Sequence, residues 1–172
     1  MIAYTMAEGR GDVDLLLFQL AQTQIAQGRR PVGTVQINTE REDACPCDMD
    51  VQVLPDEDVI RISQSLGPGA KGCRLDPTAL EKAVGLVEVE LAKGADCLIV
   101  NKFGKHEADG RGFRPVIAAA LELGIPILVG LNQLNSAAFF EFADGLAVEI
   151  APDPAALNDW MSAQIQSLSD AA

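Results

Sequence analysis

The chain has 172 residues, of which 48% are hydrophobic and 5% aromatic, and its formal net charge at pH 7 is −12. We expect one domain over residues 1–172, because this length can bury a full-sized core. The acidic balance excludes a general nucleic-acid-binding surface, which needs a broad basic face. The start has no signal-peptide leader and no apolar stretch is long enough to span a membrane, so we expect a cytoplasmic protein without membrane insertion.

The first half of the chain predicts strands and helices interrupted by a hairpin. Residues 1–5 are an expected strand, and a turn over 6–11 leads to a helix that Asp12 caps and that ends near Gly28. An acidic turn between two short strands is typical of an antiparallel hairpin. The remaining expected elements are a strand over 32–37, short strands over 49–54 and 59–63, and a helix from the pair Asp76-Pro77 to about Lys93.

The second half alternates regularly between strands and helices. The expected elements are strands over 96–101, 126–131 and 146–150, and helices over 115–123, 133–143 and 154–168. Such alternation implies parallel strands with helices on both faces. The sequence therefore predicts an α/β fold: a mostly parallel sheet flanked by helices, with a small antiparallel hairpin insertion.

The turn before the first helix lies where a P-loop would lie. That motif, G-x-x-x-x-G-K-[ST], holds phosphates with backbone amides and a lysine, and magnesium with a hydroxyl. Gly9 and Gly11 allow a tight approach and Arg10 could meet an anion, but the Lys-Ser/Thr pair is absent. Glu8 and Asp12 would repel phosphate. The alternative is an ordinary glycine turn.

A second glycine-rich loop precedes the helix that starts at residue 77. Successive amides in such a loop can form a nest for an anion, to which basic side chains add charge. The alternative is a long crossover that needs glycines for its bends. The candidate binding residues here are Ser65, Gly67, Gly69, Lys71, Gly72 and Arg74.

The run over residues 101–114 is the third candidate and the most informative. Five basic residues, counting His106, and three glycines occupy fourteen positions of an otherwise acidic chain. They follow a predicted parallel strand, and ligands of α/β proteins bind at that end of the sheet. The alternative is a solvated loop with internal salt bridges. The candidate anion-binding residues are Asn101, Lys102, Lys105, Arg111 and Arg114.

The same run contains candidate catalytic groups. Glu107 and Asp109 could pair with these cations, or position a metal or water. His106 is the single histidine; it could act as an acid or base, or have no role in chemistry.

Four cysteines are present, and in a leaderless chain we expect thiols. One C-x-C pair, Cys45 and Cys47, cannot complete four-coordinate zinc alone. Cys73 could approach if the two loops converge, so Cys47 and Cys73 are the candidate metal ligands. Cys97 lies in an apolar strand and is expected in the core.

Three segments, over residues 47–50, 63–76 and 101–114, resemble an uncharacterised bacterial domain family described as nucleoside-triphosphatase-like, whose members often lie beside molybdenum-transport genes. The resemblance extends over nearly the whole chain and implies a P-loop-NTPase-like three-layer sandwich with a degenerate P-loop. In triphosphatases of the related type, the corresponding strand ends in Asp-Glu and a Glu follows. Here Asn101 and Lys102 replace the acidic pair, and Glu107 matches the later Glu.

Three functions remain open from the sequence. The first is a binding module that takes a small anion or nucleotide between the three loops; the ligand would be a nucleotide with Mg, or an oxyanion such as phosphate or molybdate. The second is a nucleoside triphosphate phosphohydrolase that uses Glu107 or Asp109 to position water. The third is a non-catalytic interaction protein. A homodimer is expected from base rates alone.

Overall fold

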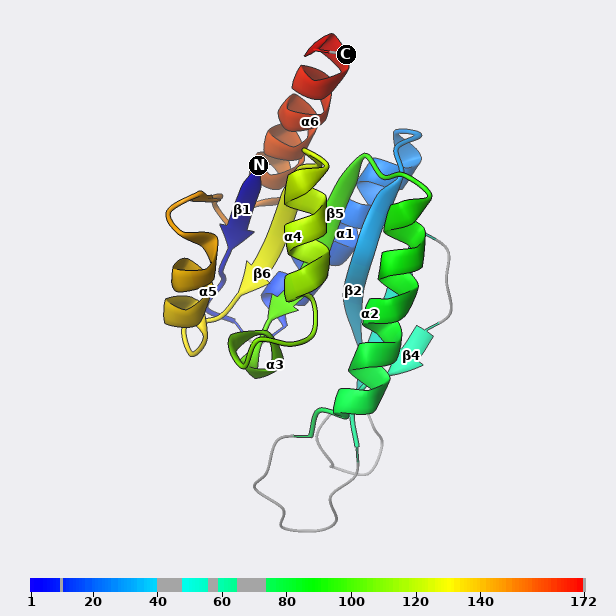
Figure 1. Ribbon diagram of the computed structural model, residues 1–172, viewed down its shortest axis with the longest axis vertical. Coiled ribbons are helices and arrows are strands. Elements are labelled where there is room, and N and C mark those ends of the chain that lie inside the picture. The colour runs from blue at the N-terminus through cyan, green and yellow to red at the C-terminus, as the bar shows by residue number, and fades with distance from the viewer. Residues whose placement is uncertain (10, 40–47, 56–58, 65–73, 172) are drawn as a thin grey trace.

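The computed structural model describes residues 1–9, 11–39, 48–55, 59–64 and 74–171 (Figure 1). Its elements, in chain order, are β1 (Ile2–Thr5), α1 (Asp12–Ala26), β2 (Pro31–Thr39), β3 (Asp48–Leu54), β4 (Val59–Arg61), α2 (Pro77–Ala92), β5 (Cys97–Phe103), α3 (Lys105–Ala108), α4 (Arg114–Glu122), β6 (Ile127–Leu131), α5 (Ser136–Ala143), β7 (Ala147–Glu149) and α6 (Pro154–Ala171).

The described strands form one sheet in the order β4-β3-β2-β5-β6-β1-β7. The five strands from β2 to β7 in that order are parallel, whereas β3 runs antiparallel to both β2 and β4. The predicted α/β class, with its mostly parallel sheet and its antiparallel hairpin, is therefore confirmed.

Helices cover both faces of the sheet, so the fold is a three-layer sandwich of the P-loop-NTPase-like type (Figure 1). On one face, Phe103 and Phe139 belong to a buried cluster that joins the sheet to α2, α4 and α5. On the other face, Leu17 of α1 and Met161 of α6 pack on the sheet around Leu128. Because both faces are covered, the central strands are largely buried: all five residues of β6 are buried.

The structure corrects several local expectations. The cap of α1 is Gly11, with φ 88°, and not Asp12, which is the first helical residue. Strand β5 continues to Phe103, two residues beyond the expected end, and the expected loop after it contains the short helix α3. Several expected elements are also shorter: β4 ends at Arg61, α5 begins at Ser136 and β7 spans Ala147–Glu149.

The cap of α2 is as the sequence predicts. The Asp76 carboxylate accepts hydrogen bonds from the amides of Thr78 and Ala79, at 2.9 and 3.2 Å, and Pro77 is the first helical residue.

Candidate functional site

A pocket of about 650 Å³ opens at the carboxyl ends of the parallel strands. It lies beside the turn between β1 and α1, where ligands of open α/β sheets bind. The described residues that line it are Met6, Ala7, Glu8, Gly9, Gly11, Val13, Asp14, Lys102, Leu131, Asn132, Gln133 and Glu149.

The first turn of α1 forms one wall of this pocket. When the chain is placed on the P-loop pattern, Gly11 is its last glycine, and Asp12 and Val13 take the positions of the lysine and the hydroxyl residue. Val13 packs against the core, and a Cβ at Gly9 would overlap the Asp12 carboxylate. The turn therefore has glycines at positions 9 and 11 but lacks the phosphate-binding side chains of a P-loop.

Three polar side chains meet beside this turn, and we call them the Lys102 corner: Asp14, Asn101 and Lys102. The Asn101 amide donates a hydrogen bond to Asp14 Oδ1 at 2.8 Å, and Lys102 Nζ lies 3.5 Å from the same oxygen. Asp14 and Asn101 are buried, with 4% and 3% exposure, while the Lys102 side chain is 42% exposed. The ammonium of Lys102, a residue of β5, therefore lies at the start of α1. A P-loop would have a lysine of its own there, and this chain has Asp12.

Asn101 also joins β5 to β2. The backbone pairing of these strands ends at Thr34 and Val100. Past this point, Asn101 Oδ1 accepts a hydrogen bond from the Gln36 amide at 2.9 Å. Only a side chain with both a donor and an acceptor can satisfy Gln36 and Asp14 together. The amide at position 101 is therefore the group that this corner requires.

Two further features adjoin the pocket at β1. The Tyr4 hydroxyl donates to the Glu149 carboxylate at 3.2 Å, and burial together with that carboxylate raises the pKa of Tyr4. Thr5 is fully buried and, within the described part of the chain, its hydroxyl has no hydrogen-bond partner. Since such a group costs about 1–3 kcal/mol when unsatisfied, a polar ligand atom or water at this strand end would stabilise it.

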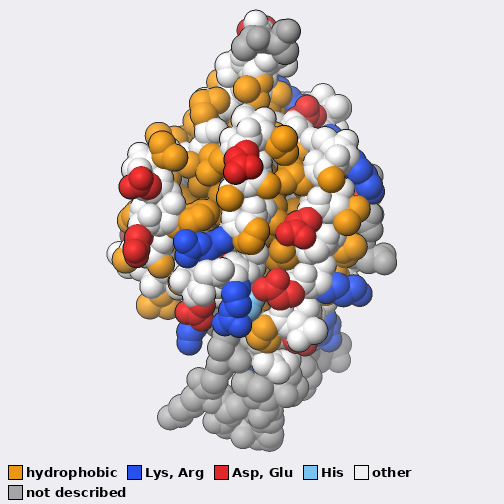
Figure 2. Space-filling model, in the orientation of Figure 1, with side chains coloured by type: hydrophobic (Ala, Val, Ile, Leu, Met, Phe, Trp, Pro, Cys, Tyr) orange, Lys and Arg blue, Asp and Glu red, His pale blue; other side chains and the backbone are white. Residues whose placement is uncertain are grey.

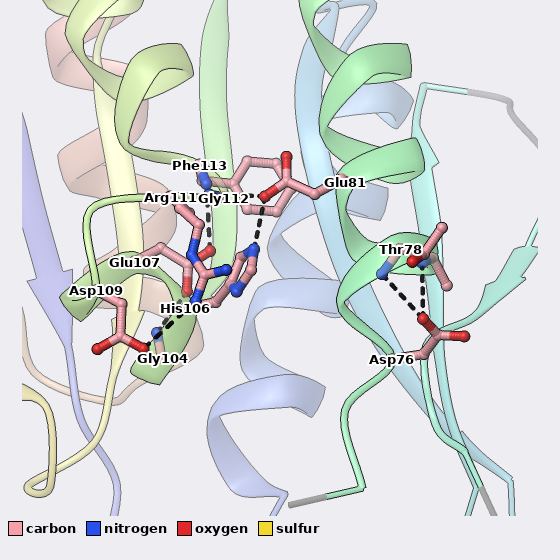
Figure 3. Close-up of polar contacts among 11 residues, drawn as sticks. Asp76, Thr78, Glu81, Gly104, His106, Glu107, Asp109, Arg111, Gly112 and Phe113 are labelled. Carbon is pink, nitrogen blue, oxygen red and sulfur yellow. Dashed lines mark hydrogen bonds and ion pairs between the residues drawn. The ribbon is translucent and has the colours of Figure 1, made fainter.

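The rest of the 101–114 run faces another part of the molecule. Glu107 is 2% exposed, and its carboxylate accepts the amides of Gly104 at 2.9 Å and Phe113 at 3.2 Å (Figure 3). These contacts close the loop around α3, and we call Gly104, Glu107 and Phe113 the Glu107 clasp. A Cβ at Gly112, whose φ is 61°, would overlap the Glu107 carboxylate. In this geometry the Glu107 carboxylate holds the two ends of the loop around α3 together.

A second contact ties this loop to α2. His106 Nε2 lies 2.6 Å from Glu81 Oε1, which also accepts the Gly112 amide at 3.2 Å (Figure 3). His106 is 5% exposed, whereas the Glu81 side chain is 48% exposed. The contact explains why the single histidine is buried.

The basic residues of the run are dispersed. Arg114 lies 4.5 Å from the centre of the Phe142 ring and donates to the Glu107 carbonyl at 3.4 Å, while Arg111 pairs weakly with Asp109 at 3.7 Å. On the face covered by α2, α4 and α5, Lys and Arg side chains alternate with Asp and Glu and do not form one basic patch (Figure 2). Among the described residues, the second half of the run has one ion pair of the kind that the alternative reading expects, between Arg111 and Asp109.

The structure thus brings Gly9, Gly11, Asn101 and Lys102 together at the pocket or beside it. Five candidates are not among the described residues that line it: Lys105, Glu107, Asp109, Arg111 and Arg114. Arg74, whose carbonyl accepts the Gln64 amide at 2.7 Å, is likewise not among them. The remaining candidates lie outside the described residues: Arg10, Cys47, Ser65, Gly67, Gly69, Lys71, Gly72 and Cys73. The catalytic roles of Glu107 and Asp109 stay predictions.

Asp14 is the site residue that the sequence reading missed. It shares the buried face of α1 with Leu17 and Ala21, at spacings of three and seven. A carboxylate on an apolar helix face needs a buried partner, and that pattern could have identified it.

The cysteine predictions divide in the same way. Cys97 is fully buried, and burial raises its pKa to about 12, so its place in the core is confirmed. Among the described residues, no group of three or more His, Cys, Asp or Glu side chains is placed to hold a metal ion.

The fold and the pocket together define a P-loop-NTPase-like α/β protein whose first turn lacks the phosphate-binding lysine. Residues 2–160 match a family described as protein of unknown function (DUF2478), and the chain belongs to that family. The chain is also similar to the molybdenum import ATP-binding protein ModC 2 of Bradyrhizobium diazoefficiens, with 32% identity over 159 residues. This match covers 92% of the chain but 18% of that relative, so the chain spans less than a fifth of its length.

No solved structure matches the chain. In the described part of the chain, no helix has the length and apolar character needed to cross a membrane.

Proposed function

We propose that the pocket beside the Lys102 corner binds a small anion or the phosphate groups of a nucleotide, and does not hydrolyse a nucleotide. The observation that carries the proposal is the position of Lys102. Its half-exposed ammonium lies at the first turn of α1, where helix amides and the helix dipole also favour an anion.

The charges at the corner leave room for one small anionic group at most. Asp14 and Lys102 offset each other, so the attraction for an anion comes from the exposed ammonium together with the α1 amides. Glu8 and Glu149 also line the pocket, and they disfavour an anion that lies far from Lys102. The anionic group is therefore expected near Lys102 and the α1 amides.

Hydrolysis is disfavoured by what stands at the first turn. Phosphoryl transfer depends on a lysine that neutralises the transferred phosphate and on a hydroxyl that holds magnesium. Asp12 and Val13 take those positions here. Asn101 and Lys102 likewise stand where the related triphosphatases carry an acidic pair.

The relative adds context for the ligand. The name of that relative joins molybdenum import to ATP binding. A nucleotide, molybdate and phosphate are therefore the ligands to test first.

The test is equilibrium binding of ATP, GTP, phosphate, molybdate and tungstate, with and without magnesium, by calorimetry. We expect Lys102→Ala to lower the affinity for the ligand at least about tenfold, because the substitution removes a charge-assisted contact. Lys105→Ala is the matched control, since Lys105 is exposed and is not among the described lining residues. Binding that survives Lys102→Ala, or no binding of any of these ligands, contradicts the proposal.

The phosphohydrolase alternative has its own readout. Phosphate release from ATP that falls on Glu107→Gln, with folding unchanged, would support the catalytic role of Glu107. We expect no release above the buffer blank.

A second candidate is an interaction protein that works with an ATP-binding import component. One observation favours it: 92% of the chain matches a segment that makes up 18% of a much longer ATP-binding protein. Co-purification with such a component that is independent of Lys102 would favour this candidate over the binding module.

A further inference from the structure

A second cavity, of about 340 Å³, lies between α1 and β2 next to the first pocket. Its described lining is Gly11, Asp14, Leu15, Phe18, Gln36 and Ile37. The three apolar side chains come from the first turns of α1 and from β2 beyond its pairing with β5.

The apolar wall of this cavity includes two side chains from the start of α1. Leu15 is 57% exposed although it lies beside the buried Asp14, and Phe18, one turn further on, is half-buried. Sites for small organic ligands are concave, mostly apolar and provided with a few polar groups that fix orientation. Asp14 and Gln36 are such groups here.

The two cavities adjoin along a shared border. Gly11 and Asp14 line both of them, and Lys102 lines the larger one. A ligand with an anionic end near Lys102 and a flat apolar end near Leu15 would contact both cavities, whereas phosphate or molybdate would fill only the first.

We propose that the ligand is a nucleotide, with its phosphates beside Lys102 and its base in the cavity formed by Leu15, Phe18 and Ile37. This inference rests on the proposed function and narrows it from anions in general to phosphate esters with a heteroaromatic ring. Ring contacts with apolar and aromatic side chains tolerate different bases, so ATP and GTP should bind similarly.

The test compares ATP with inorganic tripolyphosphate, which has the phosphates but no base, by calorimetry on the full chain. ATP should bind at least about tenfold more tightly, and Leu15→Ser should remove most of that difference while tripolyphosphate binding is unchanged. Leu123→Ser is the matched control, because Leu123 is a 63% exposed leucine at the end of α4. Leu15→Ser is neutral and lies at an exposed position, so the fold should tolerate it.

The outcomes separate the two proposals. Equal affinities for ATP and tripolyphosphate, both lost on Lys102→Ala, overturn the base cavity and leave the anion site standing. If Leu15→Ser and Leu123→Ser lower the affinity for ATP equally, that result also overturns the base cavity. If neither ATP nor tripolyphosphate binds, the inference fails; the proposed function fails with it unless phosphate, molybdate or tungstate binds and Lys102→Ala weakens that binding.

Discussion

The two ends of the run from Asn101 to Arg114 have similar composition and opposite surroundings. At the Lys102 corner, a half-exposed cation and a buried amide border a large pocket. At the Glu107 clasp, both oxygens of a buried carboxylate accept hydrogen bonds from backbone amides of the same loop. Charged residues in a glycine-rich run therefore divide into those that hold the loop and those that line a pocket, and only their partners distinguish the two.

The largest expected effect is on stability at the clasp. Glu107→Ala leaves the amides of Gly104 and Phe113 without their acceptor, and we expect the free energy of unfolding to fall by about 2–5 kcal/mol. Urea unfolding measures it, with the exposed Glu122→Ala as the control, which should change stability by no more than about 0.5 kcal/mol. A loss as small as that of the control would mean that the clasp does not hold the loop.

Asn101→Asp tests the corner in the same measurement. The new carboxylate still accepts the Gln36 amide but cannot donate to Asp14, 2.8 Å away, and it adds a like charge. We expect a loss of about 1–3 kcal/mol at pH 7. The loss should shrink at pH 5, because a protonated carboxyl can donate in place of the amide. An equal loss at both pH values contradicts this account.

Asp14→Asn tests by anion affinity whether the Lys102 corner binds the ligand independently of the second half of the run. The asparagine oxygen still accepts from Asn101, but Lys102 loses its negative neighbour, so anion affinity should rise about two- to fivefold. Asp109→Asn, which removes a negative neighbour of Arg111, should leave affinity unchanged. Calorimetry with tripolyphosphate compares them, and a similar rise in both variants would mean that the run acts as one basic surface.

The smallest expected effect belongs to the exposed pair at the end of the run. Arg111 and Asp109 are 3.7 Å apart, and their side chains are 62% and 47% exposed. Because solvent screens such pairs, Arg111→Ala should change stability by less than about 0.5 kcal/mol. A larger loss in thermal or urea unfolding would give this arginine a structural role that its contacts do not show.

Most of the fold was predictable because the longer helices and strands carry their own local signals. Alternating apolar strands and amphipathic helices predicted the parallel sheet, and the Asp76-Pro77 pair fixed the start of α2. Helix α3 was not predicted, since its four residues are too few for helical periodicity to be detected.

The site was predictable in part, because its contacts join residues that are distant in sequence. Gly9, Gly11 and Lys102 were identified from turn chemistry and strand position. The division of the run was not, because it depends on Glu81, which is 25 residues before His106, and on Asp14, which is 87 residues before Asn101. Charge density alone placed Lys105, Arg111 and Arg114 with Lys102.

The central claim is that a ligand lies at the Lys102 corner and not along the second half of the run. The most direct measurement is a nitrogen–proton correlation NMR titration of the full chain with ATP. We predict shifts for the amides of residues 6–15, Lys102 and residues 131–133, and unchanged amides for residues 105–114. Shifts that concentrate on residues 105–114, or no shifts at saturating ATP, would contradict it.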